Sequence, residues 1–396
     1  MQKKYDVAVI GGGPIGGNIA KKIAGKKYNV AIFEQNKKIG EPLKCAGLVT
    51  PRIFDMLDIS KEIVIQNQIK GANIHSPSGH ILTIGGDKVH ALVIDRTRFD
   101  KEIIQDSKKH GVDVFLENKI SSAQLQANHI DIVTSKKIEI KCKLLIGADG
   151  PHSKIRGLFQ LPQPLEFLRG IGAEISGVNL DPNFVEIFVG NKTAPGFFAW
   201  IIPTNKKGDN ARIGLCINQK SSNSPKHFFL KFLKNKHTSK YLDKTEIIKD
   251  IAGVVPLGHV KKNYTSNIMV VGDAAAQVKP TSGGGIYTGL LCAEHCSKIA
   301  VEALQKDDFS KTVLKKYQKL CSLDPGRELD LGLKFRKIFK NLSDKQLDKY
   351  IQRFSNTEIS EIITKHGDID HPSNLIKPLL KKSPSLLKLM PKLFKK

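Results

Sequence analysis

The chain contains 396 residues, which at roughly 150 residues per domain predicts two or three domains. Hydrophobic residues make up 40% and charged residues 26%, and this composition excludes a disordered, collagen-like or coiled-coil chain. Lysine and arginine total 63 against 38 aspartates and glutamates, and the net charge of +25 suits an anionic membrane surface, an acidic substrate or a nucleic acid. Because base and phosphate recognition favours bidentate arginine and lysine dominates here, we expect no nucleic-acid partner.

The six cysteines do not form a recognisable disulfide framework. They stand at positions 45, 142, 216, 292, 296 and 321 without a CxxC pair, which is typical of reduced thiols in a cytoplasmic protein. Cys292 and Cys296 are one helical turn apart, but further ligands do not follow at zinc spacing, so we expect no bound metal. The sequence also has no run of roughly 18 apolar residues of the kind that a membrane-spanning helix needs.

The first forty residues contain a β-α-β unit with a glycine-rich turn. An apolar strand at 7–10 leads into Gly11-x-Gly13-x-x-Gly16, a helical pattern follows to about residue 27, and a second strand at 30–33 ends at Glu34. Glycines at these positions let the backbone approach a pyrophosphate at the helix N-terminus, and a carboxylate at Glu34 can accept hydrogen bonds from a ribose. The unit predicts dinucleotide binding without distinguishing NAD from FAD.

Helical and strand-like patterns alternate along the rest of the chain. We predict, in order, a loop at 40–52, a helix at 97–109, strands at 112–116 and 138–146, short strands at 185–189, 197–202 and 211–217, a basic helical insert near 225–243, a buried strand at 267–271, a helix at 285–303 and basic helices beyond 310.

This order predicts an α/β fold class: a Rossmann-like dinucleotide-binding domain interrupted by a mostly antiparallel β-sheet substrate domain, with a helical C-terminal region. The predicted boundaries are 1–160 plus 250–305 for the first domain, 60–95 plus 161–249 for the second, and 306–396 for the C-terminal region.

Two later motifs identify the dinucleotide. Gly147-Ala148-Asp149-Gly150 follows one apolar strand, and Gly272-Asp273-Ala274-Ala275 follows another and precedes Gly283-Gly284-Gly285-Ile286. With the N-terminal glycine motif, they closely resemble the FAD-dependent superfamily that contains para-hydroxybenzoate hydroxylase. The resemblance implies that Asp273 holds the ribityl chain of FAD and that the amides of residues 284–286 face the flavin pyrimidine. A helix N-terminus at that place stabilises negative charge on reduced flavin.

The segment Arg96-Thr97-Arg98-Phe99-Asp100 resembles the R-x-x-F-D segment of the same superfamily, in which the arginine approaches the cofactor. By this match Arg96, rather than Arg98, is the candidate contact. The residues are equally compatible with an ordinary helix start that Asp95 caps, so both interpretations stay open.

The segment at 40–50 resembles one particular family within this FAD-dependent superfamily. Lys44-Cys45-Ala46-Gly47 resembles the K-C-A-G loop of the geranylgeranyl reductase family, above all the archaeal digeranylgeranylglycerophospholipid reductases, in which this loop lies beside the isoalloxazine. Phe198-Ala199-Trp200-Ile201-Ile202-Pro203 resembles the aromatic signature that the family has over its lipid site. Phe198 replaces the usual tyrosine, so a phenolic proton donor is excluded at that position. The resemblance covers about residues 1–330.

The resemblance implies one FAD site and one lipid site. The candidate cofactor-binding residues are Gly11, Gly13, Ile15, Gly16, Glu34, Cys45, Ala46, Gly47, Arg96, Asp149, Asp273, Gly284, Gly285 and Ile286. Cys45 is also the candidate catalytic residue, and Phe198, Trp200 and Pro203 are the candidate substrate-lining residues. The alternatives are that Cys45 is a small residue packed against the flavin and that the aromatic residues form sheet core.

We therefore expect flavin-dependent reduction of C=C bonds in the geranylgeranyl chains of archaeal membrane phospholipid precursors. Ferredoxin or NAD(P)H is expected as a transient electron donor. The alternatives are an FAD-dependent aromatic hydroxylase and a membrane-docked flavoprotein that passes electrons to quinone. Lysines and leucines interleave at 371–396, which predicts peripheral contact with the inner face of the cell membrane, unless this segment is a solvated helical cap.

Overall fold

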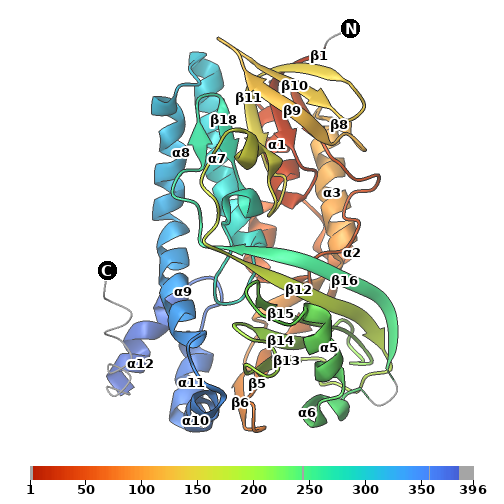
Figure 1. The fold of residues 1–396 in the computed structure, drawn as a ribbon, viewed down its shortest axis with the longest axis vertical. Coiled ribbons are helices and arrows are strands. Elements are labelled where there is room, and N and C mark those ends of the chain that lie inside the picture. Colours follow the sequence, from red (N-terminus) through yellow and green to blue (C-terminus); the bar gives the residue numbers. More distant parts are fainter. Residues whose placement is uncertain (1–2, 243–244, 356, 383–396) are drawn as a thin grey trace.

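The computed structural model describes residues 3–242, 245–355 and 357–382 and arranges them around two large β-sheets (Figure 1). The sheet that contains the N-terminal strand lies in the upper half of Figure 1, and the second sheet lies below it. A small third sheet consists of β3 (Leu48–Val49), β7 (Ala91–Ile94) and β4 (Ile65–Ile69).

The first sheet has the parallel arrangement that the β-α-β unit predicts. Its strand order is β17 (Tyr264–Thr265), β18 (Ile268–Val270), β11 (Glu139–Gly147), β1 (Lys3–Ile10), β2 (Val30–Phe33) and β8 (Asp113–Phe115). In addition, β10 (Ile130–Thr134) pairs with β11, and β9 (Ile120–Leu125) pairs with β10. Every pair from β18 to β8 is parallel. The carboxyl ends of these strands therefore reach the same edge of the sheet, where ligands bind in open α/β folds.

Both faces of the first sheet are covered, which explains its continuous apolar strands. Val7 and Val9 of β1 belong to a core shared with α1 (Pro14–Ala24), α7 (Ile286–Lys306) and α8 (Lys311–Leu323). Ala8 and Ile10 alternate with them and belong to the core on the opposite face, which β9, β10 and α4 (Lys154–Leu158) complete. Helix α3 (Arg96–Lys109) packs beside α1.

The second sheet is antiparallel apart from one parallel pair, β13 with β5. Its order is β16 (Glu246–Leu257), β12 (Glu166–Ser176), β15 (Asn210–Asn218), β14 (Phe198–Pro203), β13 (Phe184–Val189), β5 (Gly71–His75) and β6 (Ile81–Gly85). Three phenylalanines of α5 (Pro225–Leu233) pack against one face, and α6 (Lys236–Ser239) follows α5. Strand β16 extends to Leu257, so this sheet continues past the domain boundary that we predict at residue 250.

The C-terminal region is helical and packs on the second sheet. It contains α9 (Gly326–Phe339), α10 (Asp344–Phe354), α11 (Thr357–His366), the 3-10 helix η3 (Pro372–Leu375) and α12 (Ile376–Lys382). Helices α10 and α11 contact β6, and the buried Arg336 of α9 forms an ion pair with Glu166 of β12. Residues 383–396, most of the predicted membrane-binding segment, lie outside the described residues.

The predicted α/β fold class is confirmed, and two local predictions need correction. The predicted loop at 40–52 contains β3 and the start of the 3-10 helix η1 (Pro51–Met56), because Leu48 and Val49 pair with β7. The predicted insert at 225–243 contains two helices, since the Asn235 side chain accepts a hydrogen bond from the backbone of His237 and starts α6 anew. Within the described part of the chain, no helix combines the length and the apolar character needed to cross a membrane.

Candidate active site

One cavity collects the predicted motifs at the carboxyl edge of the first sheet. The loops that follow β1, β2, β11 and β18 all line it, together with the segment at 40–45 and part of β16. Its lining residues include Gly13, Ile15, Glu34, Cys45, Arg96, Asp149, Asp273, Gly285 and Ile286 of the predicted cofactor set. Residues that lie more than 250 positions apart in the chain thus face one space, as the sequence predicts.

The three motif glycines of the first turn serve different purposes. Gly11 has φ +111°, and a Cβ there would lie 2.2 Å from the Ala148 carbonyl oxygen. A Cβ on Gly16 would lie 2.1 Å from the Gly11 oxygen. Gly11 and Gly16 are therefore required by the packing of the chain itself, and neither lines the cavity. A Cβ on Gly13 would meet nothing within 4 Å, so the space beside Gly13 is open to a ligand.

Glu34 connects the ends of the first two strands. Its Oε2 accepts a hydrogen bond of 2.8 Å from the Gly12 amide, and its Oε1 accepts one of 2.8 Å from the Asn36 amide. Each carboxylate oxygen has a second lone pair. Glu34 is thus fixed by the backbone at the cavity wall and retains capacity to accept hydrogen bonds from ribose hydroxyls.

The Cys45 segment, residues 40–50, is held by the second sheet. A Cβ on Gly253 of β16 would lie 3.0 Å from the Lys44 oxygen, so a glycine in this strand allows the segment to pack against it. Arg212 of β15, only 2% exposed, donates hydrogen bonds of 3.0 Å to the Ala46 oxygen and 2.9 Å to the Ile94 oxygen. Cys45 lines the cavity, whereas Ala46 and Gly47 lie outside its lining and face Arg212.

Arg96 lies at the cavity wall behind Cys45. Its guanidinium contacts both carboxylate oxygens of Asp100, at 2.9 and 3.1 Å. Burial lowers the pKa of Arg96, but Asp100 and the nearby Cys45 sulfur more than offset this effect, so the pKa is raised and the group stays charged. The Asp95 side chain also caps the helix by accepting a hydrogen bond from the Arg98 amide, and cofactor contact by Arg96 stays a prediction.

Asp273 places a carboxylate in the cavity without a partner from the chain. It forms no side-chain hydrogen bond among the described residues, and burial raises its pKa to about 6, with Arg96 partly opposing the shift. Gly285, the N-cap residue of α7, lies so close that a Cβ on it would stand 3.0 Å from Asp273 Oδ1. A half-buried carboxylate with free acceptor capacity suits a ligand with several hydroxyl groups.

The segment that contains Asp149 is tied to the Asp273 segment through Arg156. Asp149 Oδ2 accepts hydrogen bonds from the Lys154 and Ile155 amides, at 2.7 and 3.1 Å, and so caps α4. Its Oδ1 is buried and lacks a partner among the described residues. Arg156 donates a hydrogen bond of 2.8 Å to the Ala274 oxygen, which fixes the spacing of the two motifs.

The predicted substrate-lining residues Phe198, Trp200 and Pro203 lie outside the lining of this cavity. Phe197 lies 3.5 Å from the Cβ position of Gly283. Its ring stacks on Phe198 with 4.2 Å between centroids, and Phe198 meets Trp200 edge-on at 6.1 Å. Pro203 is buried at the end of β14, and its carbonyl accepts a hydrogen bond from Asn67. Their predicted contact with substrate stays a prediction.

Several lining residues are absent from the predicted cofactor-binding set. Val254 and Val255 of β16, Val278, and Pro42 to Lys44 complete the cavity wall. Glycine at 253, inside a strand, is the one signal that could have indicated close approach of another segment at β16. Gly284 is absent from the lining because the Lys279 side chain lies over it.

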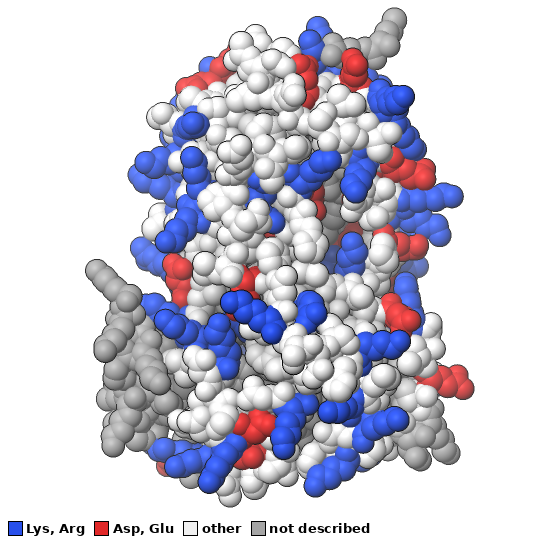
Figure 2. All heavy atoms as spheres, in the orientation of Figure 1, with Lys and Arg blue, Asp and Glu red and all other residues white. Residues whose placement is uncertain are grey.

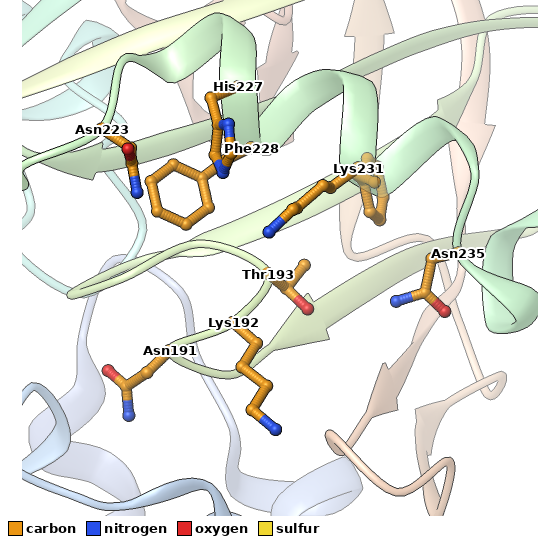
Figure 3. A pocket seen from close by; sticks show the side chains of 9 residues that line it. Asn191, Lys192, Thr193, Asn223, His227, Phe228, Lys231 and Asn235 are labelled. Carbon is orange, nitrogen blue, oxygen red and sulfur yellow. The ribbon is translucent and has the colours of Figure 1, made fainter.

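A second hollow lies between α5 and the turn at 191–193 (Figure 3). The side chains around it are mainly polar, with Lys192 and Lys231 on opposite sides. The predicted cofactor and substrate residues all lie elsewhere, so the cavity at the carboxyl edge of the first sheet is the candidate active site.

Comparisons with known proteins agree with this geometry. Residues 4–322 match the protein family described as an FAD binding domain. The chain is 32% identical over 393 residues to the digeranylgeranylglycerophospholipid reductase of Methanocaldococcus jannaschii, covering 97% of each chain. It is 30% identical to digeranylgeranylglycerophospholipid reductase 1 of Methanococcoides burtonii, covering 88% of this chain and 87% of that one.

The fold is similar to the crystal structure of a geranylgeranyl bacteriochlorophyll reductase-like protein from Thermoplasma acidophilum. The TM-score is 0.87 at 23% identity, and the similarity covers 100% of each chain.

The cavity fits the FAD cofactor of this family. Open space beside Gly13 at the start of α1 suits the pyrophosphate, and Glu34 suits the adenosine ribose. The unpartnered carboxylate of Asp273 suits the ribityl hydroxyls, and the start of α7 at Gly285 offers backbone amides to the flavin pyrimidine. These individual contacts stay predictions.

Gly13 and Gly11 provide a matched pair of substitutions. Gly13→Ala adds a methyl group to open space, so we expect the unfolding free energy of the apoprotein to change by less than about 1 kcal/mol. FAD affinity should fall at least about tenfold, because the methyl occupies the space through which pyrophosphate approaches the backbone. Gly11→Ala should instead lower the unfolding free energy by about 2–4 kcal/mol through strain and overlap. Urea unfolding measures the unfolding free energy, and FAD titration measures the affinity of each variant. A Gly13→Ala variant with wild-type FAD affinity would contradict the placement of the pyrophosphate beside Gly13.

Replacement of the Asp273 carboxylate should have opposite effects on the stability of the apoprotein and on its affinity for FAD. Because its pKa of about 6 in the fold lies above the ordinary 3.8, the apoprotein loses stability as pH rises through that window. Asp273→Asn should therefore stabilise the apoprotein near pH 7 by about 1–3 kcal/mol. Hydroxyl donors favour the ionised carboxylate, so FAD affinity of the wild type should fall about tenfold from about pH 7 to about pH 5.

The Asn variant should bind FAD more weakly near pH 7 and with little pH dependence across this range. Denaturation of the apoprotein and fluorescence titration with FAD, each as a function of pH, give both quantities. A variant that is destabilised, or that keeps the wild-type pH profile of FAD binding, would exclude this role for Asp273.

Proposed function

The chain belongs to the FAD-dependent digeranylgeranylglycerophospholipid reductase family, and on that premise we propose that it reduces C=C bonds in the geranylgeranyl chains of membrane phospholipid precursors. It is a flavoprotein oxidoreductase whose cofactor is FAD. The observation that carries the proposal is that Cys45, the residue that distinguishes this family's loop, lines the same cavity as Gly13 and Asp273.

The chemistry that bound FAD supplies is transfer of a hydride to one carbon of the alkene, and a proton must reach the other carbon. An isolated alkene has no carbonyl group that a side chain could polarise, so the site must exclude water and fix the alkene position. Val254 and Val255 present apolar side chains to the cavity, and the Phe197, Phe198 and Trp200 rings continue this apolar surface behind Gly283.

Cys45 is the candidate proton donor. Its sulfur accepts a hydrogen bond from the Gly47 amide at 3.4 Å, and the charged Arg96 guanidinium lies close to it. Phe198 has no hydroxyl group, and the carboxylate of Asp100 is already paired with Arg96. The thiol therefore stands at the cavity wall with a positive group behind it to stabilise the thiolate that remains after proton transfer.

The partners beyond the lipid are part of the proposal. The exposed Lys44 at the cavity wall and the many lysines and arginines on the face in Figure 2 suit an acidic electron carrier or NAD(P)H. Helix α12, in the described part of the C-terminal segment, carries Lys377, Lys381 and Lys382 without an acidic residue. This charge supports peripheral contact with anionic lipid.

The activity is tested with the FAD-loaded chain and digeranylgeranylglycerophospholipid in detergent. We expect mass spectrometry to show the lipid gaining two hydrogens per reduced bond, with either ferredoxin or NAD(P)H as donor. Cys45→Ala should retain FAD and reduce the lipid about a hundredfold more slowly. Cys142→Ala, which removes a buried thiol of β11 outside the cavity lining, should react at the wild-type rate.

Two results would contradict the proposal. An unchanged lipid together with oxygen uptake on an aromatic substrate would indicate a hydroxylase, and an unchanged lipid together with quinone reduction would indicate an electron-transfer flavoprotein. If Cys45→Ala retains FAD and reduces lipid at the wild-type rate, the cysteine takes no part in the chemistry.

A further inference from the structure

A buried carboxylate of the C-terminal region joins two segments that line the cavity. The Asp370 side chain is 0% exposed, and its Oδ1 pairs with Lys279 Nζ at 2.6 Å. Its Oδ2 accepts hydrogen bonds from Thr50 Oγ1 at 2.6 Å and Arg52 Nη1 at 3.3 Å. Asp368 completes this group, which we call the Asp370 cluster: Thr50, Arg52, Lys279, Asp368 and Asp370.

The cluster is balanced in charge and fixed in geometry. Arg52 forms two hydrogen bonds to Asp368, at 2.7 and 2.9 Å. Although burial acts to raise the pKa of Asp368, Arg52 and the amides of Asp370 and His371 lower it to about 2. The two carboxylates thus face two cations. A buried charge that loses its partner is strongly unfavourable, so each member depends on the others.

Lys279 belongs to a turn that forms part of the cavity wall. Its backbone closes the turn at 279–284, because its amide donates to the Gly284 oxygen at 3.1 Å and its oxygen accepts from the Gly283 amide at 2.8 Å. Its Cε and Nζ lie 3.1 and 3.5 Å from the Cβ position of Gly284. The ammonium group therefore rests on the glycine between the two cavity-lining residues Gly283 and Gly285, at the start of α7.

The other partners of Asp370 lie at the end of the Cys45 segment and just after it. Thr50 ends that segment and Arg52 is the second residue of η1, so the single carboxylate of Asp370 spans from one cavity-lining segment to the other. Helix α9 reinforces the contact, since a Cβ on Gly332 would lie 3.0 Å from Pro280. The C-terminal region thus contacts the cofactor site from outside through defined charged groups.

We propose that Asp370 is a positioning residue that holds the Lys279 ammonium against the glycine turn, and that this ion pair sets the reduction potential of the bound FAD. A positive charge beside the N-terminus of α7 favours the anionic reduced flavin, and the carboxylate of Asp370 limits that effect. The inference rests on FAD binding alone and is independent of which substrate is reduced.

The two members of the pair predict shifts of opposite sign. Lys279→Met leaves the negative charge of Asp370 less compensated beside the turn, so the reduced flavin is disfavoured and the midpoint potential falls. Asp370→Asn leaves the ammonium unneutralised, so the midpoint potential rises. Loosening of the turn alone would move both variants in the same direction.

The test is a spectroscopic redox titration of the FAD-loaded full chain against reference dyes. We expect shifts of about tenfold in the two-electron reduction equilibrium, or about 30 mV, downward for Lys279→Met and upward for Asp370→Asn. The double variant Lys279→Met/Asp370→Asn restores the charge balance, so its midpoint potential should return toward that of the wild type. Lys279→Arg keeps the positive charge, so its midpoint potential should stay close to that of the wild type. Asp348→Asn, which changes an aspartate of α10 bound to Ser78, should leave the potential unchanged.

The readout does not require tight cofactor binding. If a variant binds FAD weakly, the ratio of its dissociation constants for oxidised and reduced FAD gives the same shift. If Lys279→Met does not fold, Asp370→Asn and the double variant still define the sign. Unchanged potentials, or shifts of the same sign in both single variants, would overturn the proposal even if lipid reduction is established.

Discussion

The backbone of Gly11 approaches the Ala148 carbonyl so closely that a side chain does not fit between them. This approach joins the loops that leave β1 and β11, and the parallel order of the sheet then places the loops after β2 and β18 beside them. Without it the four loops would not enclose one cavity. A position that tolerates only glycine, at φ +111°, is therefore the constraint on which the site depends.

Much of the site follows from local patterns because its residues act through backbone geometry close to them in the chain. The turn at 11–16, the carboxylate at Glu34 and the pair of Asp273 with the start of α7 belong to strand-turn-helix units, which a sequence reveals directly. A motif allowed Arg96 to be chosen over Arg98 as the candidate cofactor contact. In the structure the Arg98 side chain is exposed and donates a hydrogen bond to the Ile63 oxygen.

The residues that sequence reasoning missed act across long distances in the chain. Arg212 holds the Cys45 segment from the second sheet, and Asp370 reaches it from the C-terminal region. Neither residue belongs to a sequence motif. The contacts of each one depend on how distant segments of the chain approach each other in the fold, and sequence patterns do not reveal this approach. The same cause affects Ala46 and Gly47, which lie outside the cavity lining because they face Arg212 instead.

Stability and function oppose each other at Asp273, where the fold half-buries a carboxylate without giving it a partner. Such a group lowers the stability of the protein until a ligand supplies hydrogen bonds to it. Destabilising groups of this kind are common at functional sites. A crystal structure of the protein with FAD tests this account most directly. We expect the ribityl chain within hydrogen-bond distance of Asp273, the pyrophosphate at Gly13 and the isoalloxazine between Cys45 and Gly285. An isoalloxazine bound outside this cavity, or a ribityl chain without contact to Asp273, would contradict it.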